Sequence, residues 1–177
     1  MKITYFTRFR WISSGFTLVE LLVTIAIAAI LLTIAVPSFT RLISSSNTDS
    51  AVNRLGRSFA YARSEAVTRA ENVVVCTSSD GATCSGNWGN GWITYVDADD
   101  DNVFDAGEER LKVEDINSLA VMFALRDDNN NTLAFTSVCF NSLGEECNGT
   151  VTSVTFTATA NGESSSVTLN STGALSL

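Results

Sequence analysis

The stretch Gly15-Phe16-Thr17-Leu18-Val19-Glu20 opens a run of mostly apolar residues that continues to Val36. About 20 such residues in a helix cross a hydrocarbon core about 30 Å thick, so residues 16–36 are predicted to form a transmembrane helix. The polar members of the run are one acid and three hydroxyl residues: Thr17, Glu20, Thr24 and Thr33. A carboxylate at membrane depth costs about 2.5–3.5 kcal/mol on insertion scales, so Glu20 is expected to have a function.

The segment before this run is short and basic. Residues 1–15 contain Lys2, Arg8 and Arg10 and no acidic residue, and they end at the small residue Gly15. A secretory signal carries its cleavage site after the apolar region, whereas here the small residue comes before it. We therefore interpret residues 1–15 as a leader peptide and expect the apolar helix to remain in the mature chain. The alternative is an uncleaved signal anchor with an incidental glutamate near its cytoplasmic end.

Residues 15–23, Gly-Phe-Thr-Leu-Val-Glu-Leu-Leu-Val, resemble the prepilin cleavage signature of type IV pilins and type II secretion pseudopilins. The resemblance implies cleavage between Gly15 and Phe16 by a prepilin peptidase, N-methylation of Phe16, and a helix that packs with its neighbours in a filament. Glu20 would then be the fifth residue of the mature chain and would pair with the new amine of an adjacent subunit. An ammonium partner would offset much of the cost of its charge.

The composition indicates an acidic, exported chain with one globular domain. About 140 residues follow the apolar run, which suits a single core. The formal charge is −8, and loss of the leader would leave eight basic against 19 acidic residues, a charge of −11. Such a surface repels nucleic acid unless its charges are segregated. The chain has no histidine and no recognisable catalytic constellation, so we expect no enzymatic activity and no required cofactor.

Residues 37–71 are predicted to continue the helix in amphipathic form. Apolar residues recur at alternating steps of three and four, which is the spacing of one buried helical face: Val52, Leu55, Phe59, Ala62 and Ala66. Glu65 and Arg69 stand at i,i+4, where opposite charges attract.

Residues 72–177 are predicted to form a β-rich domain. The Asn161-Gly162 pair is typical of a hairpin turn between two of its strands. The expected strands cover residues 73–76, 92–96, 119–125, 132–135, 154–159 and 166–169.

Four cysteines form two equally spaced pairs, Cys76 with Cys84 and Cys139 with Cys147. Four cysteines allow three connectivities, but local closure costs less chain entropy and fits two hairpin-like loops. In an oxidising periplasm we therefore favour two local disulfides. A zinc site is the competing interpretation, although this spacing differs from that of the usual zinc knuckles.

The segment from Asp97 to Glu108 carries acids at the spacing of a calcium-binding loop. Loop positions 1, 3, 5, 9 and 12 are occupied by Asp97, Asp99, Asp101, Asp105 and Glu108. Position 6, where such loops have glycine, is Asn102, which tolerates a left-handed conformation. The preceding residues read as a strand rather than a helix, so the alternative is an acidic hairpin turn on the surface.

Two tryptophans lie between glycines and asparagines, at Trp88 and Trp92. Exposed aromatic rings in such a setting could form a carbohydrate-binding platform. Large aromatic residues at strand ends more often anchor a core, and we predict that role here.

A second set of sequence features resembles the FimT and H-type pseudopilin family. They are the segment 59–67, then Cys76, Trp88, Gly91-Trp92, Asp97 and Gly107-Glu108. The resemblance covers most of residues 15–112 and is thinner beyond. It implies an α+β type IV pilin fold, with a long N-terminal helix packed on a C-terminal antiparallel β-rich domain.

The family resemblance implies a minor pilin that initiates or caps type IV pilus assembly. An H-type pseudopilin of a type II secretion pseudopilus is the alternative. The implied partners are the prepilin peptidase, other minor pilins, the major pilin and the inner-membrane assembly platform. The implied location is the bacterial inner membrane, with a single span and a periplasmic domain that enters a fibre at the cell surface.

A third hypothesis is a DNA-binding tip pilin used in natural transformation. Some FimT-like pilins bind DNA through a C-terminal Gly-Arg-x-Arg motif. This chain instead reads Gly173-Ala174-Leu175-Ser176 and has no basic residue after Arg126. Because phosphate contacts drive nucleic-acid affinity, the sequence argues against DNA binding.

Overall fold

The structure is a computed structural model that describes residues 15–147, 149 and 152–176. Its described residues divide into two compact units, one that ends at Phe39 and one that begins at Thr40, and residues 1–14 of the predicted leader lie outside the described part of the chain. The elements are α1 (Leu18–Arg69), β1 (Asn72–Thr77), β2 (Gly91–Asp97), β3 (Arg110–Asp115), the 3-10 helix η1 (Asn117–Leu119), β4 (Met122–Asp127), β5 (Thr132–Leu133), β6 (Ser137–Phe140), β7 (Ser153–Ala160), β8 (Glu163–Asn170) and β9 (Leu175–Ser176).

The first unit holds the start of α1. The helix begins at Leu18 because Thr17 caps it: the backbone N–H of Glu20 donates to Thr17 Oγ1 at 3.2 Å. A threonine followed three residues later by a glutamate is the sequence pattern of a capping box. Further along, the hydroxyls of Thr24 and Thr33 donate to carbonyls one turn earlier, at 2.9 and 2.7 Å. These hydroxyls therefore need no partner outside the helix.

The second unit contains two antiparallel sheets. Within the described residues, one has the strand order β3-β2-β1-β6 and the other the order β5-β4-β7-β8-β9. The longest pairing joins β7 and β8 over eight residues, from Ser153 opposite Asn170 to Ala160 opposite Glu163. Asn161 and Gly162 connect these strands, both at positive φ, as the hairpin prediction requires. The predicted α+β fold is confirmed.

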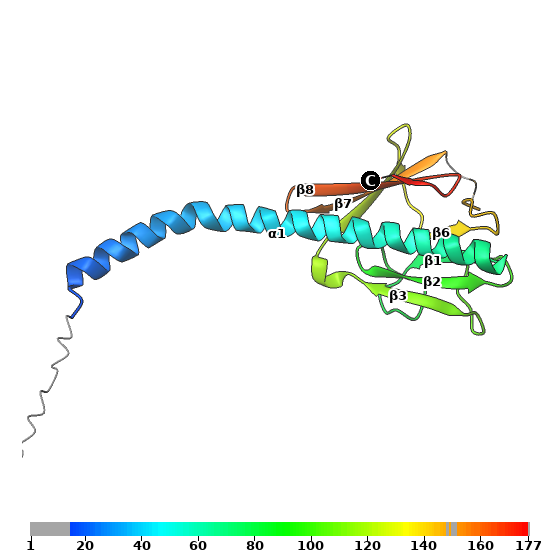
Figure 1. Ribbon diagram of the computed structural model, residues 1–177, viewed down its shortest axis with the longest axis horizontal. Helices are drawn as coiled ribbons and strands as arrows, with labels where there is room; N and C mark the ends of the chain where they lie inside the picture. The colour runs from blue at the N-terminus through cyan, green and yellow to red at the C-terminus, as the bar shows by residue number, and fades with distance from the viewer. Residues whose placement is uncertain (1–14, 148, 150–151, 177) are drawn as a thin grey trace, which may run out of the picture. The chain divides into compact units, whose positions relative to one another are not determined.

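Residues 40–69 of α1 pack on both sheets. In Figure 1 this part of the helix has β1, β2 and β3 on one side and β7 and β8 on the other. All five residues of the predicted apolar face are buried: Val52, Leu55, Phe59, Ala62 and Ala66. Phe59 is at the centre of the core, with its ring 5.2 Å from that of Phe156 and 5.9 Å from that of Trp88.

The sheet that contains β1 and β2 is buried on both faces. Val73 and Val75 join the core beneath α1, whereas the alternate residues Val74 and Cys76 join a second cluster on the opposite face. Ile93, Tyr95 and Cys139 complete this second cluster, and Phe104 and Cys147 pack against it from loops. Loops therefore cover the sheet face that the helix leaves open.

The element boundaries differ from the sequence prediction at several places. Three strands were missed, namely β3, β6 and β9. β3 has the mostly polar sequence Arg-Leu-Lys-Val-Glu-Asp because it is an edge strand, with three of its six residues exposed and none fully buried. The strand expected over 119–125 is wrong at its start, since residues 117–119 form η1 and β4 begins at Met122. α1 ends at Arg69 rather than at residue 71, because Ala70 turns left-handed with φ of 57°.

Candidate functional site

The predicted processing and assembly residues lie at the N-terminal end of the first unit. Gly15, Phe16 and Glu20 are all exposed, and the Phe16 side chain has 72% of its surface accessible. The apolar residues that follow are exposed as well, and α1 is the one helix in the described part of the chain that is long and apolar enough to cross a membrane. In the described residues no salt bridge involves Glu20. An exposed apolar helix of this kind requires lipid or protein around it.

Both cysteine pairs form local disulfides, as the sequence favoured. Cys76 binds Cys84 with their Cα atoms 5.6 Å apart, and Cys139 binds Cys147 with their Cα atoms 5.3 Å apart. Cys76 and Cys139 lie on neighbouring strands, β1 and β6, and both are buried in the second cluster. The disulfides thus fix two loops to one face of the sheet.

The two tryptophans are core residues, as predicted. Trp92 is fully buried and Trp88 is 3% exposed. The Nε1–H of Trp88 donates to the carbonyl of Phe135 at 3.0 Å. Neither ring is available for stacking on a carbohydrate, so the platform interpretation is wrong.

The acidic loop connects β2 to β3 in an antiparallel hairpin. Its two end carboxylates hold its backbone in place. Asp97 accepts hydrogen bonds from the N–H groups of Asp101 and Asn102, at 3.2 and 3.0 Å. Glu108 accepts from the N–H groups of Ala98 and Asp105, both at 3.0 Å. Asn102 adopts a φ of 60°, the left-handed conformation expected at position 6.

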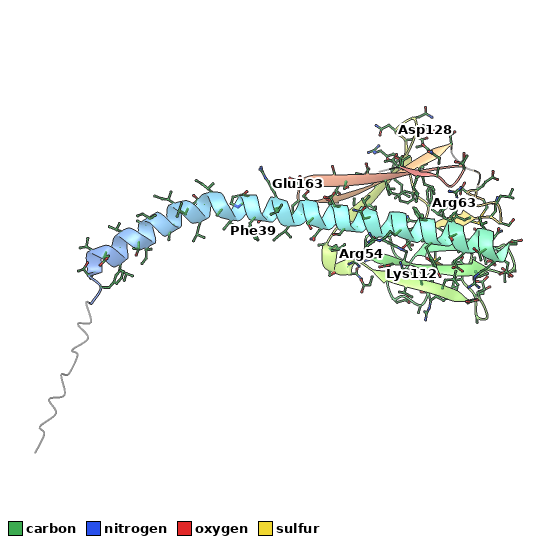
Figure 2. All side chains as sticks on the ribbon, in the orientation of Figure 1. Phe39, Arg54, Arg63, Lys112, Asp128 and Glu163 are labelled. Atoms are coloured by element: carbon green, nitrogen blue, oxygen red, sulfur yellow. A yellow bond between two sulfur atoms is a disulfide. The ribbon has the colours of Figure 1, made fainter. Side chains whose placement is uncertain are left out.

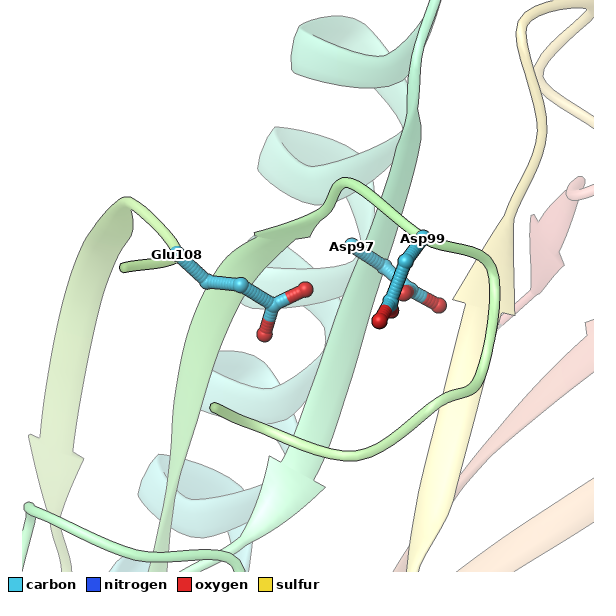
Figure 3. Close-up of side chains that lie close together, drawn as sticks. All are labelled: Asp97, Asp99 and Glu108. Carbon is cyan, nitrogen blue, oxygen red and sulfur yellow. The ribbon is translucent and has the colours of Figure 1, made fainter. Parts of the chain in front are cut away.

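The carboxylates of the loop converge in two groups that share Asp99. One contains Asp97, Asp99 and Glu108, and the other contains Asp99, Asp101 and Asp105; within each group, ligand oxygens lie within 4.8 Å of one another. Figure 3 shows Glu108 extending towards Asp97 and Asp99 from the other side of the loop. The structure thus brings the five predicted loop acids into two groups of three that have Asp99 in common.

Asp97 differs from the other acids of the loop because it is buried, with 2% of its surface exposed. Burial raises the pKa of this carboxyl, and the nearby charges of Asp100 and Asp101 act in the same direction. The two backbone N–H donors oppose the rise because they stabilise the carboxylate.

Sequence reasoning missed one polar residue at this loop, Tyr95. Its side chain is fully buried and its ring lies 5.0 Å from that of Phe104 in the loop. Within the described part of the chain its hydroxyl has no hydrogen-bond partner. Burial raises the pKa of this hydroxyl, and the carboxylates of Asp97 and Glu108 contribute further. The signal available in the sequence was position: Tyr95 lies two residues before Asp97 and so points to the same face of the strand.

The arginines of α1 mostly contact other parts of their own chain. Arg54 lies 3.7 Å from Glu114, which also binds Lys112 at 2.7 Å, and Figure 2 shows Arg54 and Lys112 close to each other. Arg69 binds Glu65 at 2.7 Å, the predicted i,i+4 pair, and Glu109 at 2.8 Å. Side chains held by intramolecular partners are less available for phosphate groups.

The first part of α1 is apolar and exposed, and its second part packs on two antiparallel sheets. This combination is typical of a pilin-like protein. Residues 51–173 match the family model of the type II transport protein GspH, and residues 13–36 match the prokaryotic N-terminal methylation motif. The chain belongs to the GspH family. This places it among the minor pilins and pseudopilins, which are structural proteins.

Solved structures with a similar fold include the type IV minor pilin FimU of Pseudomonas aeruginosa strain PAO1, in two crystal forms. The first has a TM-score of 0.51 at 19% identity, over 75% of this chain and 88% of FimU. The second has a TM-score of 0.49 at 19% identity, over 73% of this chain and 90% of FimU. No curated protein matches the chain. These comparisons give no support to the DNA-binding hypothesis.

Proposed function

We propose that this chain is a minor pilin that initiates or caps the assembly of a type IV pilus. The observation that carries the proposal is the order of two matches in one chain, a methylation motif over residues 13–36 followed by a GspH domain over residues 51–173. In this proposal a prepilin peptidase cuts between Gly15 and Phe16, and Phe16 is N-methylated. The apolar helix anchors the subunit in the inner membrane, with the β-rich domain in the periplasm.

Glu20 acts in this proposal as the residue that sets the register between subunits. Its exposed carboxylate follows apolar neighbours and has no ion-pair partner within the described residues. The amine created by cleavage before Phe16 would lie on an adjacent subunit and would neutralise it. A charge pair in an apolar surrounding is sensitive to position, so it favours one register over its neighbours.

The β-rich domain selects partners in this proposal. The partners would be other minor pilins, the major pilin and the assembly platform of the inner membrane. The likeness to FimU, a type IV minor pilin, supports assembly into a pilus. The second candidate is an H-type pseudopilin of a type II secretion pseudopilus, and the description of the matched family as a type II transport protein favours it.

Gene deletion in a strain whose pilus retraction is blocked tests the proposal. We expect surface pili, counted by electron microscopy, to disappear and to return when the gene is restored on a plasmid. Restoration with Glu20→Ala should fail although the protein is present and processed, whereas restoration with the conservative control Glu20→Asp should retain part of the function.

The same strains separate the two machines. Normal pilus numbers together with a loss of exoprotein secretion would contradict the pilus assignment and favour the pseudopilus. Mass spectrometry of the purified protein tests processing, and a terminus at Met1 in cells that contain the peptidase would exclude cleavage before Phe16.

A further inference from the structure

We propose that the loop from Asp97 to Glu108 binds one calcium ion through the carboxylates of Asp97, Asp99, Asp101, Asp105 and Glu108. The proposal concerns the β domain alone and is independent of the machine in which the subunit works.

The spacing of the carboxylates suits a single cation. Within each group the ligand oxygens are within 4.8 Å of one another, and Asp99 belongs to both groups. A calcium ion with oxygen ligands at about 2.3–2.6 Å holds oxygens on its opposite sides about 5 Å apart. One ion next to Asp99 can therefore collect ligands from both groups after small rotations of exposed side chains.

The buried hydroxyl of Tyr95 is a second observation, independent of the acidic residues themselves. It has no hydrogen-bond partner among the described residues although Tyr95 is fully buried, and a buried hydroxyl without a partner costs free energy. The loop covers it through Phe104, whose ring is 5.0 Å away. Tyr95 and Asp97 are two residues apart on β2 and so lie on the same face of the strand, and Phe104 belongs to the acidic loop, so the Tyr95 side chain lies on the sheet face that this loop covers. Calcium sites commonly keep a water ligand, and an ion-bound water would give this hydroxyl its partner.

The charge balance of the loop also calls for a cation. In the described part of the chain no salt bridge involves any of the five carboxylates. Arg69 binds Glu109, one residue beyond the loop, and not one of these five acids. Clustered carboxylates repel one another, and a bound divalent cation converts this repulsion into shared attraction.

Calcium suits the loop better than magnesium. Calcium accepts six to eight oxygen ligands in flexible geometry, whereas magnesium demands a near-ideal octahedron and keeps most of its water. Five carboxylates on one short loop, held by backbone hydrogen bonds at Asp97 and Glu108, provide many oxygens without octahedral order. Position 7, which gives a backbone carbonyl in calcium loops, is Val103, and any residue can fill that role.

The test uses the full mature chain in detergent micelles, with melting followed at matched ionic strength in 2 mM calcium and in chelator. For a dissociation constant of about 0.1 mM, calcium should raise the melting temperature by about 4–7 °C. Isothermal titration with calcium should give one site per chain. Magnesium at the same concentration should raise the melting temperature by less than half as much.

Asp99→Asn is the decisive variant because Asp99 is exposed and accepts no hydrogen bond found in the described residues. It should lower calcium affinity at least about tenfold and leave melting in chelator unchanged or raised, since a repelling charge is removed. Asp49→Asn, an exposed acid on α1, is the matched control and should retain the full calcium response. Tyr95→Phe should weaken calcium binding several-fold without lowering the melting temperature in chelator.

Equal melting of the wild-type chain in calcium and in chelator would overturn the proposal. An equal loss of the calcium response in Asp99→Asn and Asp49→Asn would also overturn it, because the ion would then be screening net charge rather than occupying this loop.

Discussion

The Nε–H of Arg63 donates to the carbonyl oxygen of Gly144 at 2.8 Å and ties α1 to a loop 81 residues further along the chain. Gly144 and Gly173 both pack against the Arg63 side chain, and a Cβ on either would lie 3.0 Å from Nε. Both glycines also adopt positive φ, at 76° and 72°. The helix therefore meets two turns of the β domain through one arginine.

Removal of this arginine should loosen the β domain from α1. Arg63→Ala leaves a partly buried carbonyl without its donor and removes the packing of the arginine stem, so we expect a loss of about 1–3 kcal/mol in the free energy of unfolding. Arg57→Ala, at an exposed position on the same helix, should change it by less than about 0.5 kcal/mol. Chemical denaturation in detergent measures both, and equal effects would show that the Arg63 contact contributes nothing specific.

The core around Phe59 should be the most sensitive to truncation. The Phe59 ring contacts those of Trp88, Phe140 and Phe156, with centroids 5.2 to 6.0 Å apart. We expect Phe59→Ala to cost about 3–5 kcal/mol, because the cavity adds to the lost transfer energy. Phe59→Leu should cost less, about 1–2 kcal/mol.

The matched control is Val67→Ala on the same helix, where the side chain is 52% exposed. This change should stay within about 0.5 kcal/mol. Urea titrations of the three variants supply the comparison. A loss at Phe59→Ala no larger than that at Val67→Ala would contradict the assignment of Phe59 to the centre of the core.

The left-handed end of α1 offers a stabilising change. Ala70 is exposed and has a φ of 57°, a conformation that costs a residue with a side chain about 1–2 kcal/mol. Ala70→Gly removes this cost, and part of the gain is offset by the greater freedom of glycine in the unfolded chain. We expect a net gain of about 0.5–1 kcal/mol. Ala60→Gly, at an exposed position inside the helix, should instead lose about 1 kcal/mol. Melting curves that shift in the same direction for both variants would refute the prediction.

Local patterns in the sequence predicted the parts of the fold that short-range periodicity controls. The steps of three and four from Val52 to Ala66 identify the buried face of α1, and Asn161-Gly162 identifies the β7–β8 turn. The apolar run with its single acid at Glu20 identifies the membrane-spanning candidate. Each of these features depends on residues that are close together in the sequence, so the local sequence is enough to predict it.

Features that depend on distant residues were not predictable in this way. β3 has only two apolar residues, Leu111 and Val113, in a short polar segment, and its pairing with β2 holds it in place. The packing of Phe104 on Tyr95 is a tertiary contact. The sequence shows only that Tyr95 and Asp97 are two residues apart and so lie on the same face of a strand. The link between Arg63 and Gly144 has no signature in either neighbourhood.

The loop closed by the Cys76–Cys84 disulfide should lose stability in acid through Asp80. This carboxylate accepts from the N–H groups of Ala82 and Thr83, at 2.8 and 2.9 Å, and from the Thr83 hydroxyl at 3.0 Å. The N–H of Ala82 is the main cause that holds the pKa of Asp80 well below its usual range. The pKa of Asp80 is lower in the folded chain than in the unfolded chain, where it is about 3.9. The stabilisation that the ionised carboxylate gives to the folded chain is therefore fully present above about pH 3.9. It declines as the pH falls below that value.

The variant Asp80→Asn lacks the Asp80 charge but keeps every other acid of the wild-type chain. A difference in melting between the two proteins therefore reports Asp80 alone. We expect the wild-type chain to melt at a higher temperature than Asp80→Asn at pH 7, and the gap to narrow steadily below about pH 4, where the unfolded carboxyl is protonated. Melting curves of both proteins at half-unit steps from pH 7 to pH 3 measure the gap. A gap that stays constant to pH 3 would show that the Asp80 charge does not stabilise the loop, since a lowered pKa in the folded chain requires the stabilisation to decline as the unfolded carboxyl takes up its proton.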